Sequence, residues 1–133
     1  MKKIITAVFA ATSVLALASC GSNINLEGKW EIATLNGEQV KAIETNPFIE
    51  FNTEEGKVHG NTGCNIMNGS YTQEGSKLTF GNMATTMMAG PDMELEREVL
   101  DAIGKTASVK PGSEGTLRVF DAEGNQIMEL KKK

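Results

Sequence analysis

The sequence predicts a mostly antiparallel β domain with one α-helix packed across it, a fold of the α+β class that is mainly β. Short segments of alternating apolar and polar residues recur along the chain, and glycine-rich or Asn/Asp-rich turns separate them. One segment beginning near residue 90 changes to the period of a helix. Short strands at regular spacing with turn signals between them are typical of a β-sandwich or a β-barrel.

The first half of the domain is predicted to form three strands. The dipeptide Asn36-Gly37 follows the first strand and suits a tight β-hairpin, because both residues tolerate positive φ. A Glu-Glu-Gly turn at 54–56 separates the other two. The predicted strands are residues 28–35, 48–53 and 57–61.

The second half is predicted to contribute five more strands. Segments 70–72 and 77–80 pair across the turn at 73–76. The remaining candidates are 106–110, 116–120 and 126–130, with turns at 112–115 and 121–125.

Residues 90–104 are predicted to form the helix. Pro91 fits the first helical position, where its missing N–H has no cost, and Asp92 suits the positive end of the helix dipole. Gly104 provides a stop. The buried stripe expected from an i, i+4, i+7, i+8 spacing consists of Leu95, Val99, Ala102 and Ile103.

The N-terminus is predicted to be a lipoprotein export signal. Lys2 and Lys3 precede an uncharged apolar run that is too short for a confident membrane-spanning helix, which needs about 20 apolar residues. The run ends in Leu-Ala-Ser-Cys at 17–20, which matches a lipobox. We therefore expect residues 1–19 to be the signal peptide, with cleavage between Ser19 and Cys20 and lipid attached to Cys20. The alternative is an ordinary secretory signal with a coincidental cysteine.

The expected mature chain has a short lipidated tether at 20–27 and one domain at 28–133. Without the two signal lysines it carries 11 basic and 17 acidic residues, a net charge of −6, which argues against nucleic acid as a partner. The three lysines at 131–133 are interpreted as a solvated tail. Gly21, rather than Asp, after the cysteine favours the periplasmic face of the outer membrane under the enterobacterial sorting rule.

An ordered series of motifs in the middle of the chain resembles the META domain, the family of the HslJ heat-shock lipoproteins. The resemblance extends over about residues 26–131. The matching segments are Gly63-Cys64-Asn65, Gly69-Ser70-Tyr71, Leu78-Thr79-Phe80, Thr85-Thr86-Met87-Met88-Ala89 and Met93-Glu94-Leu95-Glu96.

The resemblance implies a small lipocalin-like β-barrel with one helix, no defining enzymatic activity, and an association with envelope stress and antibiotic tolerance. Many members carry a second cysteine after the Met-Ala dipeptide as a disulfide partner for the cysteine of Gly-Cys-Asn. Gly90 occupies that position here, so Cys64 has no such partner. The family-motif residues carried over, with an expected structural role, are Gly63, Cys64, Asn65, Gly69, Tyr71, Thr86, Met88 and Glu96.

The glycine-rich segment 60–65 has two interpretations. Its backbone N–H groups could bind an anion, or it is a bulged corner of the barrel in which Asn65 bonds the local backbone. Cys64 and His59 could form a thiol–base pair, but no third group orients them, so we expect a buried structural thiol.

The methionines also have several interpretations. They could fill an irregular core or line an adaptable apolar groove, and as thioethers they could bind copper(I). Their spacing does not repeat, so no metal site is predicted. The acidic residues of the helix are predicted to form a solvated face: Glu94, Glu96, Glu98 and Asp101.

The leading hypothesis is a non-catalytic, lipid-anchored envelope protein that serves as an interaction or stress-protective module, without a cofactor. The alternative is a lipocalin-like carrier of a small apolar ligand. A carrier predicts an apolar pocket inside the barrel, whereas an interaction module predicts a filled interior and an exposed apolar patch. A hydrolase or thiol enzyme is the least favoured of the three.

Overall fold

A computed structural model describes residues 24–133 of the protein. The predicted signal peptide, its cleavage site at Ser19 and the lipidation site Cys20 lie outside these residues. In the described part, no helix is both long enough and apolar enough to span a membrane.

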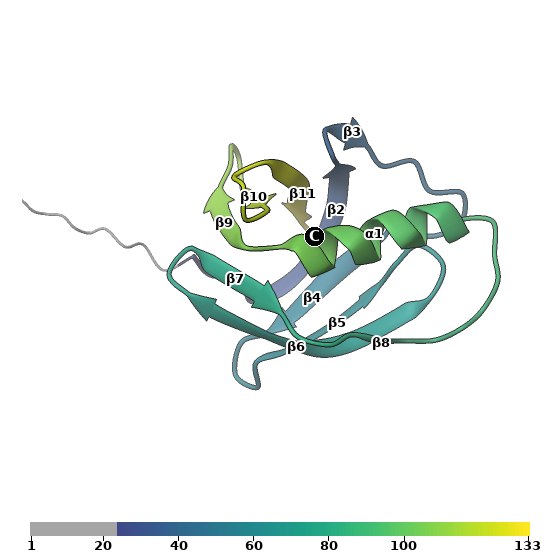
Figure 1. Ribbon diagram of the computed structural model, residues 1–133, viewed down its shortest axis with the longest axis horizontal. Coiled ribbons are helices and arrows are strands. Elements are labelled where there is room, and N and C mark those ends of the chain that lie inside the picture. Colours follow the sequence, from purple (N-terminus) through teal and green to yellow (C-terminus); the bar gives the residue numbers. More distant parts are fainter. Residues whose placement is uncertain (1–23) are drawn as a thin grey trace, which may run out of the picture.

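The strands form a closed antiparallel barrel of eight strands, to which two short strands are added (Figure 1). The sheet runs in the order β11-β10-β9-β7-β6-β5-β4-β2, and pairing of β11 with β2 closes it. This confirms the predicted mainly β fold with one helix. The strands are β2 (Gly28–Leu35), β3 (Glu38–Gln39), β4 (Phe48–Asn52), β5 (Lys57–Asn61), β6 (Ile66–Glu74), β7 (Lys77–Phe80), β8 (Ala84–Thr85), β9 (Ser108–Pro111), β10 (Thr116–Phe120) and β11 (Gln126–Lys132).

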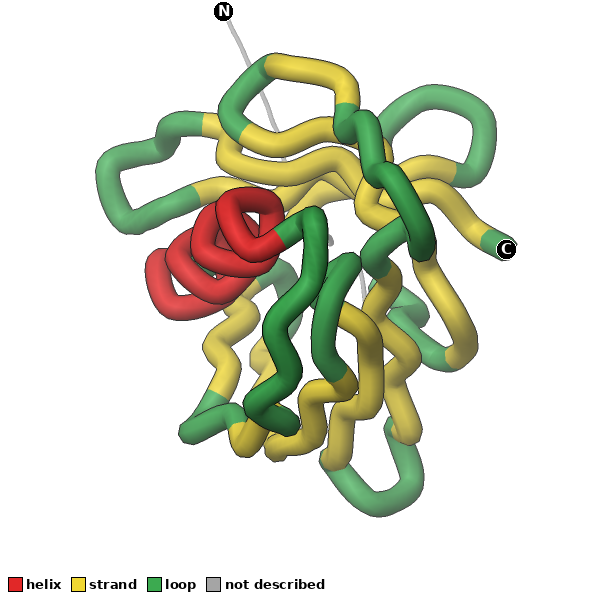
Figure 2. Tube along the Cα trace, turned by 90° about the vertical axis from the view of Figure 1, so that its right-hand side faces the viewer, coloured by secondary structure: helices red, strands yellow, loops and turns green. Residues whose placement is uncertain are grey.

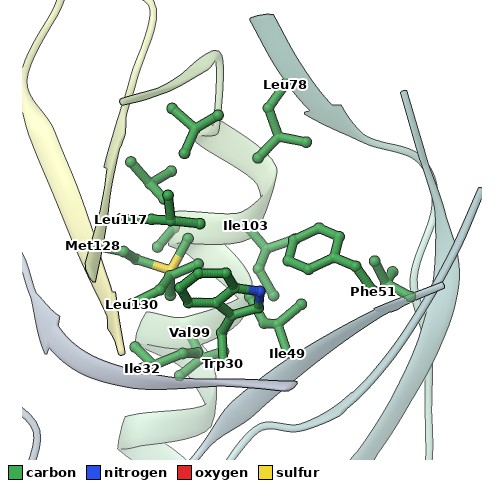
Figure 3. Packing of buried hydrophobic residues seen from close by; sticks show 14 of the residues in the cluster. Trp30, Ile32, Ile49, Phe51, Leu78, Val99, Ile103, Leu117, Met128 and Leu130 are labelled. Atoms are coloured by element: carbon green, nitrogen blue, oxygen red, sulfur yellow. The ribbon is translucent and has the colours of Figure 1, made fainter. Parts of the chain in front are cut away.

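Side chains fill the interior of the barrel. Alternate residues of the strands point inward, as Ile49 and Phe51 of β4 do, because successive side chains of a strand face opposite sides. The Phe51 ring meets the Tyr71 ring edge to face, with 5.0 Å between centroids. Figure 3 shows Phe51 beside Ile103 of the helix, with Trp30 and Met128 in the same cluster.

Two bulges explain where the strict alternation fails. Ala33 is an extra residue in β2, because Ile32 pairs with Leu130 and Thr34 with Glu129. Ile127 is the extra residue in β11, and as a result it and its neighbour Met128 are both buried. Such bulges bend the strands and increase their twist, as barrel closure requires.

Helix α1 (Met93–Lys105) lies along the side of the barrel, between β6–β7 and β9–β11 (Figures 1 and 2). It covers the weakest seam, since β7 and β9 pair only at Lys77 and Ser108. Val99, Ala102 and Ile103 are buried, which confirms most of the predicted stripe; Leu95 is half-buried.

Both predicted ends of the helix were wrong. Pro91 lies in a turn before the helix, and Asp92 is the N-cap residue. Gly104 is an ordinary helical residue. The chain leaves the helix at Thr106, whose hydroxyl donates to the Ala102 carbonyl at 2.9 Å and whose N–H donates to Ile103.

Other boundaries shift for identifiable reasons. Strand β6 begins at Ile66, four residues before the predicted segment, because residues 66–70 pair with β5. The predicted hairpin at Asn36-Gly37 is confirmed: both residues have positive φ, and β3 pairs with β2. Strand β8 was not predicted, β9 begins later than expected, and β11 includes two residues of the predicted solvated tail, Lys131 and Lys132.

Residues 24–27, which the sequence placed in the tether, pack against the barrel. Leu26 is fully buried, and its carbonyl accepts a hydrogen bond from the Trp30 indole at 2.8 Å. Glu27 accepts hydrogen bonds from the N–H and the hydroxyl of Thr53, which lower the pKa of Glu27. The packed domain therefore begins before the expected boundary at residue 28.

We predict that Phe51→Ala lowers the free energy of unfolding by about 3–5 kcal/mol, because it opens a cavity in the filled interior. Phe120→Ala is the matched control, since Phe120 is half-buried and lies outside the core cluster. Urea denaturation should show a clearly smaller loss for the control. Equal losses would mean that the interior around Phe51 is not tightly packed.

Candidate functional site

Most of the family-motif residues meet at one end of the barrel, where the turn 62–65, the loop 86–92 and the start of α1 lie together. Figure 1 shows this end on the right, where the chain leaves β8 and turns back into α1. The β6–β7 hairpin lies at the opposite end. The two ends therefore present different segments of the chain.

The turn 62–65 is closed by its own side chains. The Thr62 N–H donates to the Asn65 carbonyl at 2.8 Å, and the Asn65 N–H donates to the Thr62 hydroxyl at 2.8 Å. The Gly63 and Cys64 N–H groups donate to Asn61 Oδ1 and Thr62 Oγ1. Because these four N–H groups already have partners, the segment does not offer them to an anion, and the bulged-corner interpretation holds.

Asn65 joins the turn to the loop that follows β8. Its Oδ1 accepts hydrogen bonds from the Thr86 hydroxyl at 2.7 Å and from the Met88 N–H at 2.8 Å. Its Nδ2 donates to the Met88 carbonyl at 3.1 Å and to Glu96 Oε1 at 2.8 Å. All four hydrogen-bonding positions of the amide are therefore used. The amide binds the Met88 backbone as a neighbouring strand would.

Glu96 is not part of a solvated acidic face, contrary to the prediction. It is half-buried, and its Oε1 accepts hydrogen bonds from the Thr62 hydroxyl at 2.6 Å and from the Asn65 amide. Hydrogen bonds to a charged acceptor are the stronger kind. Glu96 therefore fixes the first turn of α1 to the turn 62–65. Its helix neighbours Glu94, Glu98 and Asp101 are exposed, as predicted.

Asp92 makes a second connection between the helix and a distant loop. Its side chain is buried and accepts hydrogen bonds from the Ile43 N–H at 2.9 Å and the Glu44 N–H at 3.3 Å. The sequence suggested only a favourable interaction with the helix dipole. The contact to residues nearly fifty positions earlier was not foreseeable from local pattern.

The Cys64 thiol is half-buried rather than fully buried. Its Sγ lies 3.5 Å from the Met88 carbonyl and 3.5 Å from Met93 Sδ. Desolvation raises the pKa of Cys64, and the nearby carboxylates of Glu96, Asp92 and Glu44 raise it further. This environment disfavours the thiolate, the form that acts as a nucleophile.

His59 does not form a pair with Cys64. It projects outward from β5, where its Nδ1 lies 3.0 Å from Asn68 Oδ1 and its ring contacts Phe48. The fold thus separates the two side chains from which the sequence could have built a thiol–base pair.

The other motif residues have structural roles. Gly63 has φ +101°, and a Cβ there would lie 2.9 Å from Leu95 of the helix. At Gly69 a Cβ would meet the Met83 sulfur at 2.4 Å. Tyr71 is buried against Phe51. The Thr86 N–H donates to the Ile66 carbonyl, and the Thr86 hydroxyl accepts a hydrogen bond from the Ile66 N–H.

Several large apolar side chains around the turn are exposed, and we call this surface the methionine end. Met87 is 93% exposed and Met88 is 64% exposed. The surface consists of Ile43, Ile66, Met87, Met88 and Met93. Three contacts connect these segments: Ile66 with Thr86, Ile43 with Asp92, and Met93 with Cys64.

Two of the surface depressions have mostly polar linings, whereas another, of about 330 Å³ beside Trp30 and Leu117, is more apolar. An open depression of about 680 Å³ on β4–β6 is lined by polar and charged residues such as Glu50, Lys57 and His59. A smaller one of about 260 Å³ lies between β3 and α1 and includes Glu38, Glu94 and Glu98 beside Lys41. The second depression borders the methionine end through Asp92.

We predict that Asn65→Ala lowers the free energy of unfolding by about 2–4 kcal/mol, because buried partners lose their hydrogen bonds. Asn65→Asp should cost at least as much at neutral pH, since it removes both donated bonds and adds a charge beside Glu96. As the pH falls toward about 4, where carboxyl groups become protonated, the deficit relative to wild type should shrink more for the Asp variant than for the Ala variant, because only the Asp variant also loses the repulsion between two carboxylates. Parallel pH profiles for the two variants would contradict the hydrogen-bonding scheme.

We predict that Gly90→Cys forms a disulfide with Cys64 under oxidising conditions. A Cβ at residue 90 would lie 3.0 Å from Cys64 Sγ, which is about the spacing of these two atoms across a disulfide. Closing the loop between the two residues should stabilise the protein by about 3 kcal/mol. Mass spectrometry should show the loss of two hydrogen atoms to the oxidant, and Gly104→Cys, on the exposed helix surface, is the control. Two free thiols in the oxidised Gly90→Cys protein would refute this geometry.

Comparisons with known proteins agree with this architecture. A solved NMR structure aligns with a TM-score of 0.62 and 22% identity, covering 80% of this chain and 89% of the other. An NMR structure of a protein from Burkholderia xenovorans aligns with a TM-score of 0.62 and 19% identity, and the alignment covers 93% of this chain and 99% of the other. A crystal structure of a DUF4847 family protein from Bacteroides vulgatus aligns with a TM-score of 0.62 and 13% identity, and the alignment covers 81% of this chain and 94% of the other. At these identities the likeness concerns the fold alone.

A search of curated proteins found no match. The model of the META domain family matches residues 22–133, which include the whole barrel, the helix and the cluster around Asn65. The chain therefore belongs to the META domain family.

Proposed function

We propose that this protein is a non-catalytic, lipid-anchored envelope module that binds a partner protein through the methionine end. The observation that carries the proposal is the contrast between a filled interior and an exposed apolar end. Phe51, Ile49 and Met128 are almost completely buried inside the barrel, whereas Met87 and Met88 are largely exposed outside it. Exposed groups of large apolar side chains are typical of interaction sites.

The anchor would orient this surface. Ile24, the first described residue, accepts a hydrogen bond from Gln73 of β6, close to the β6–β7 turn. If Cys20 carries the lipid, the chain from Cys20 to Ile24 extends at most about 14 Å. The β6–β7 end would therefore stay near the bilayer, and the methionine end would face away from it.

The charges around the methionine end define the chemistry of the partner. Glu44 and Glu94 lie next to Ile43 and Met93 in the chain, and both are exposed. Glu38 and Glu98 line the adjacent depression. We therefore propose a protein segment that presents apolar side chains flanked by lysine or arginine. Flexible methionine side chains can adapt to such a segment.

The carrier alternative receives less support. An apolar ligand inside the barrel needs a cavity lined by apolar residues. The inward-facing positions of β2 and β4 are instead occupied by large, closely packed side chains such as Trp30, Ile49 and Phe51 (Figure 3). The stress-protective role is an expectation from the family resemblance. In the proposal, envelope stress is the process in which the partner protein would act.

The anchor and the interaction can be tested separately in the full chain expressed in bacteria. Cys20→Ser should move the protein from the membrane fraction to the soluble envelope fraction and prevent its labelling by a fatty-acid probe. Retention of both membrane association and labelling in Cys20→Ser would refute the anchor. This result does not depend on the partner.

For the interaction, a photocrosslinking amino acid at Met87 should capture a defined partner protein. The same probe at Glu54, an exposed residue in the turn at the opposite end, should not. Charge reversal by Glu94→Lys should reduce the captured amount, as should high salt, which screens exposed charges. Capture that is equal from both positions, or unaffected by Glu94→Lys and by salt, would refute the proposed surface and partner chemistry.

A further inference from the structure

Two sulfur atoms from distant parts of the chain meet at the methionine end. Cys64 Sγ, in the turn 62–65, lies 3.5 Å from Met93 Sδ, in the first turn of α1. The sequence spacing of the methionines shows no repeating metal-binding pattern. The fold nevertheless places a thiol and a thioether in direct contact at the surface.

A third sulfur residue is fixed beside this pair. The Met88 carbonyl lies 3.5 Å from Cys64 Sγ, and the Met88 backbone is held there by both atoms of the Asn65 amide. The Met88 side chain is 64% exposed, so it is free to change rotamer. The backbones of Cys64, Met88 and Met93 are thus positioned independently of any ligand.

Gly90 places no side chain next to the Cys64 thiol. A Cβ at this position would lie 3.0 Å from Cys64 Sγ, so any larger side chain would occupy the space next to the sulfur. Instead, the thiol is half-buried and still reachable. The structure therefore combines two sulfur donors in contact, a third sulfur residue whose backbone is held beside them, and a thiol that is not fully covered.

We infer that Cys64 and Met93, with Met88 as a third donor, form a binding site for a soft monovalent cation such as copper(I) or silver(I). Thiolate and thioether ligands select soft metals, whereas harder divalent ions need oxygen or imidazole donors. Among residues 24–133, no group of three or more His, Cys, Asp or Glu side chains is arranged to hold a metal. The site is thus distinguished from a zinc or calcium site by its dependence on methionine.

Binding requires no change of oxidation state. The Cys64 thiol releases its proton to solvent as the sulfur–metal bond forms, and the thioethers donate lone pairs without losing a group. The thiolate neutralises the charge of the cation. The neighbouring carboxylates of Asp92 and Glu96 already accept hydrogen bonds from Ile43, Glu44, Thr62 and Asn65, so the site does not call on them as ligands.

The test is a competition titration of the full chain, reduced and anaerobic, with copper(I) supplied as its bicinchoninate complex. The wild-type protein should withdraw one copper(I) per chain. Cys64→Ser and Met93→Leu should each abolish this withdrawal, and Met88→Leu should weaken it. Met83→Leu is the matched control, because Met83 packs against the barrel near Gly69 and should leave binding unchanged. Thermal unfolding of each variant shows that it is folded.

A second measurement guards against a misfolded variant. In wild-type protein labelled on the methionine methyl groups, silver(I) should shift the signals of Met88 and Met93 and leave that of Met83 in place. Failure of the wild-type protein to compete for copper(I), or binding that survives Cys64→Ser and Met93→Leu, would overturn the inference. Binding that zinc(II) displaces at equal concentration would overturn it too, because zinc(II) is held by thiolate, imidazole or oxygen donors and a site that depends on two thioethers should not prefer it.

Discussion

The side-chain amide of Asn65 joins three segments that are distant in the sequence: the turn 62–65, the loop after β8 and the first turn of α1. Only a group with two donors and two acceptor positions can bind the Met88 N–H and carbonyl, the Thr86 hydroxyl and Glu96 at once. Because the amide is buried, each of these bonds would be costly to leave unmade. Asn65 thereby positions the loop part of the methionine end, since Met87 lies between Thr86 and Met88, which both donate to the Asn65 amide oxygen.

The barrel interior and the methionine end have different roles. The interior contributes stability and offers little space for chemistry, whereas the end around Cys64 contains exposed apolar side chains, a free thiol and carboxylates. Gly90 lies directly beside the Cys64 sulfur at this end of the barrel. Where the family resemblance implies a disulfide, this chain has a glycine beside the sulfur, so non-covalent contacts, chiefly the hydrogen bonds of Asn65, hold the loop to the turn.

The pattern of neighbouring residues in the sequence predicted the strands and the hairpin, because these depend on local interactions. Alternation identified β2, β4, β5, β7 and β10 with nearly correct boundaries, and Asn36-Gly37 identified a hairpin. The start of β6 was missed because Asn68 and Gly69 are rarely strand formers, although pairing with β5 imposes the extended conformation. Pro91 suits both a helix start and the turn before it. The inward contact of Glu96 and the meeting of Cys64 with Met93 depend on residues about thirty positions apart, which no local period encodes.

Hydrogen exchange of single backbone amides in the loop after β8 tests the role of Asn65 most directly. The Met88 N–H donates to Asn65 Oδ1 and the Thr86 N–H donates to Ile66, whereas the described structure gives the Met87 N–H no partner. Exchange should therefore be slow at Thr86 and Met88 and fast at Met87, even though both methionine side chains are largely exposed. If Met88 exchanged as fast as Met87, the Asn65 amide would not hold this loop, and the loop part of the methionine end would not be fixed by Asn65.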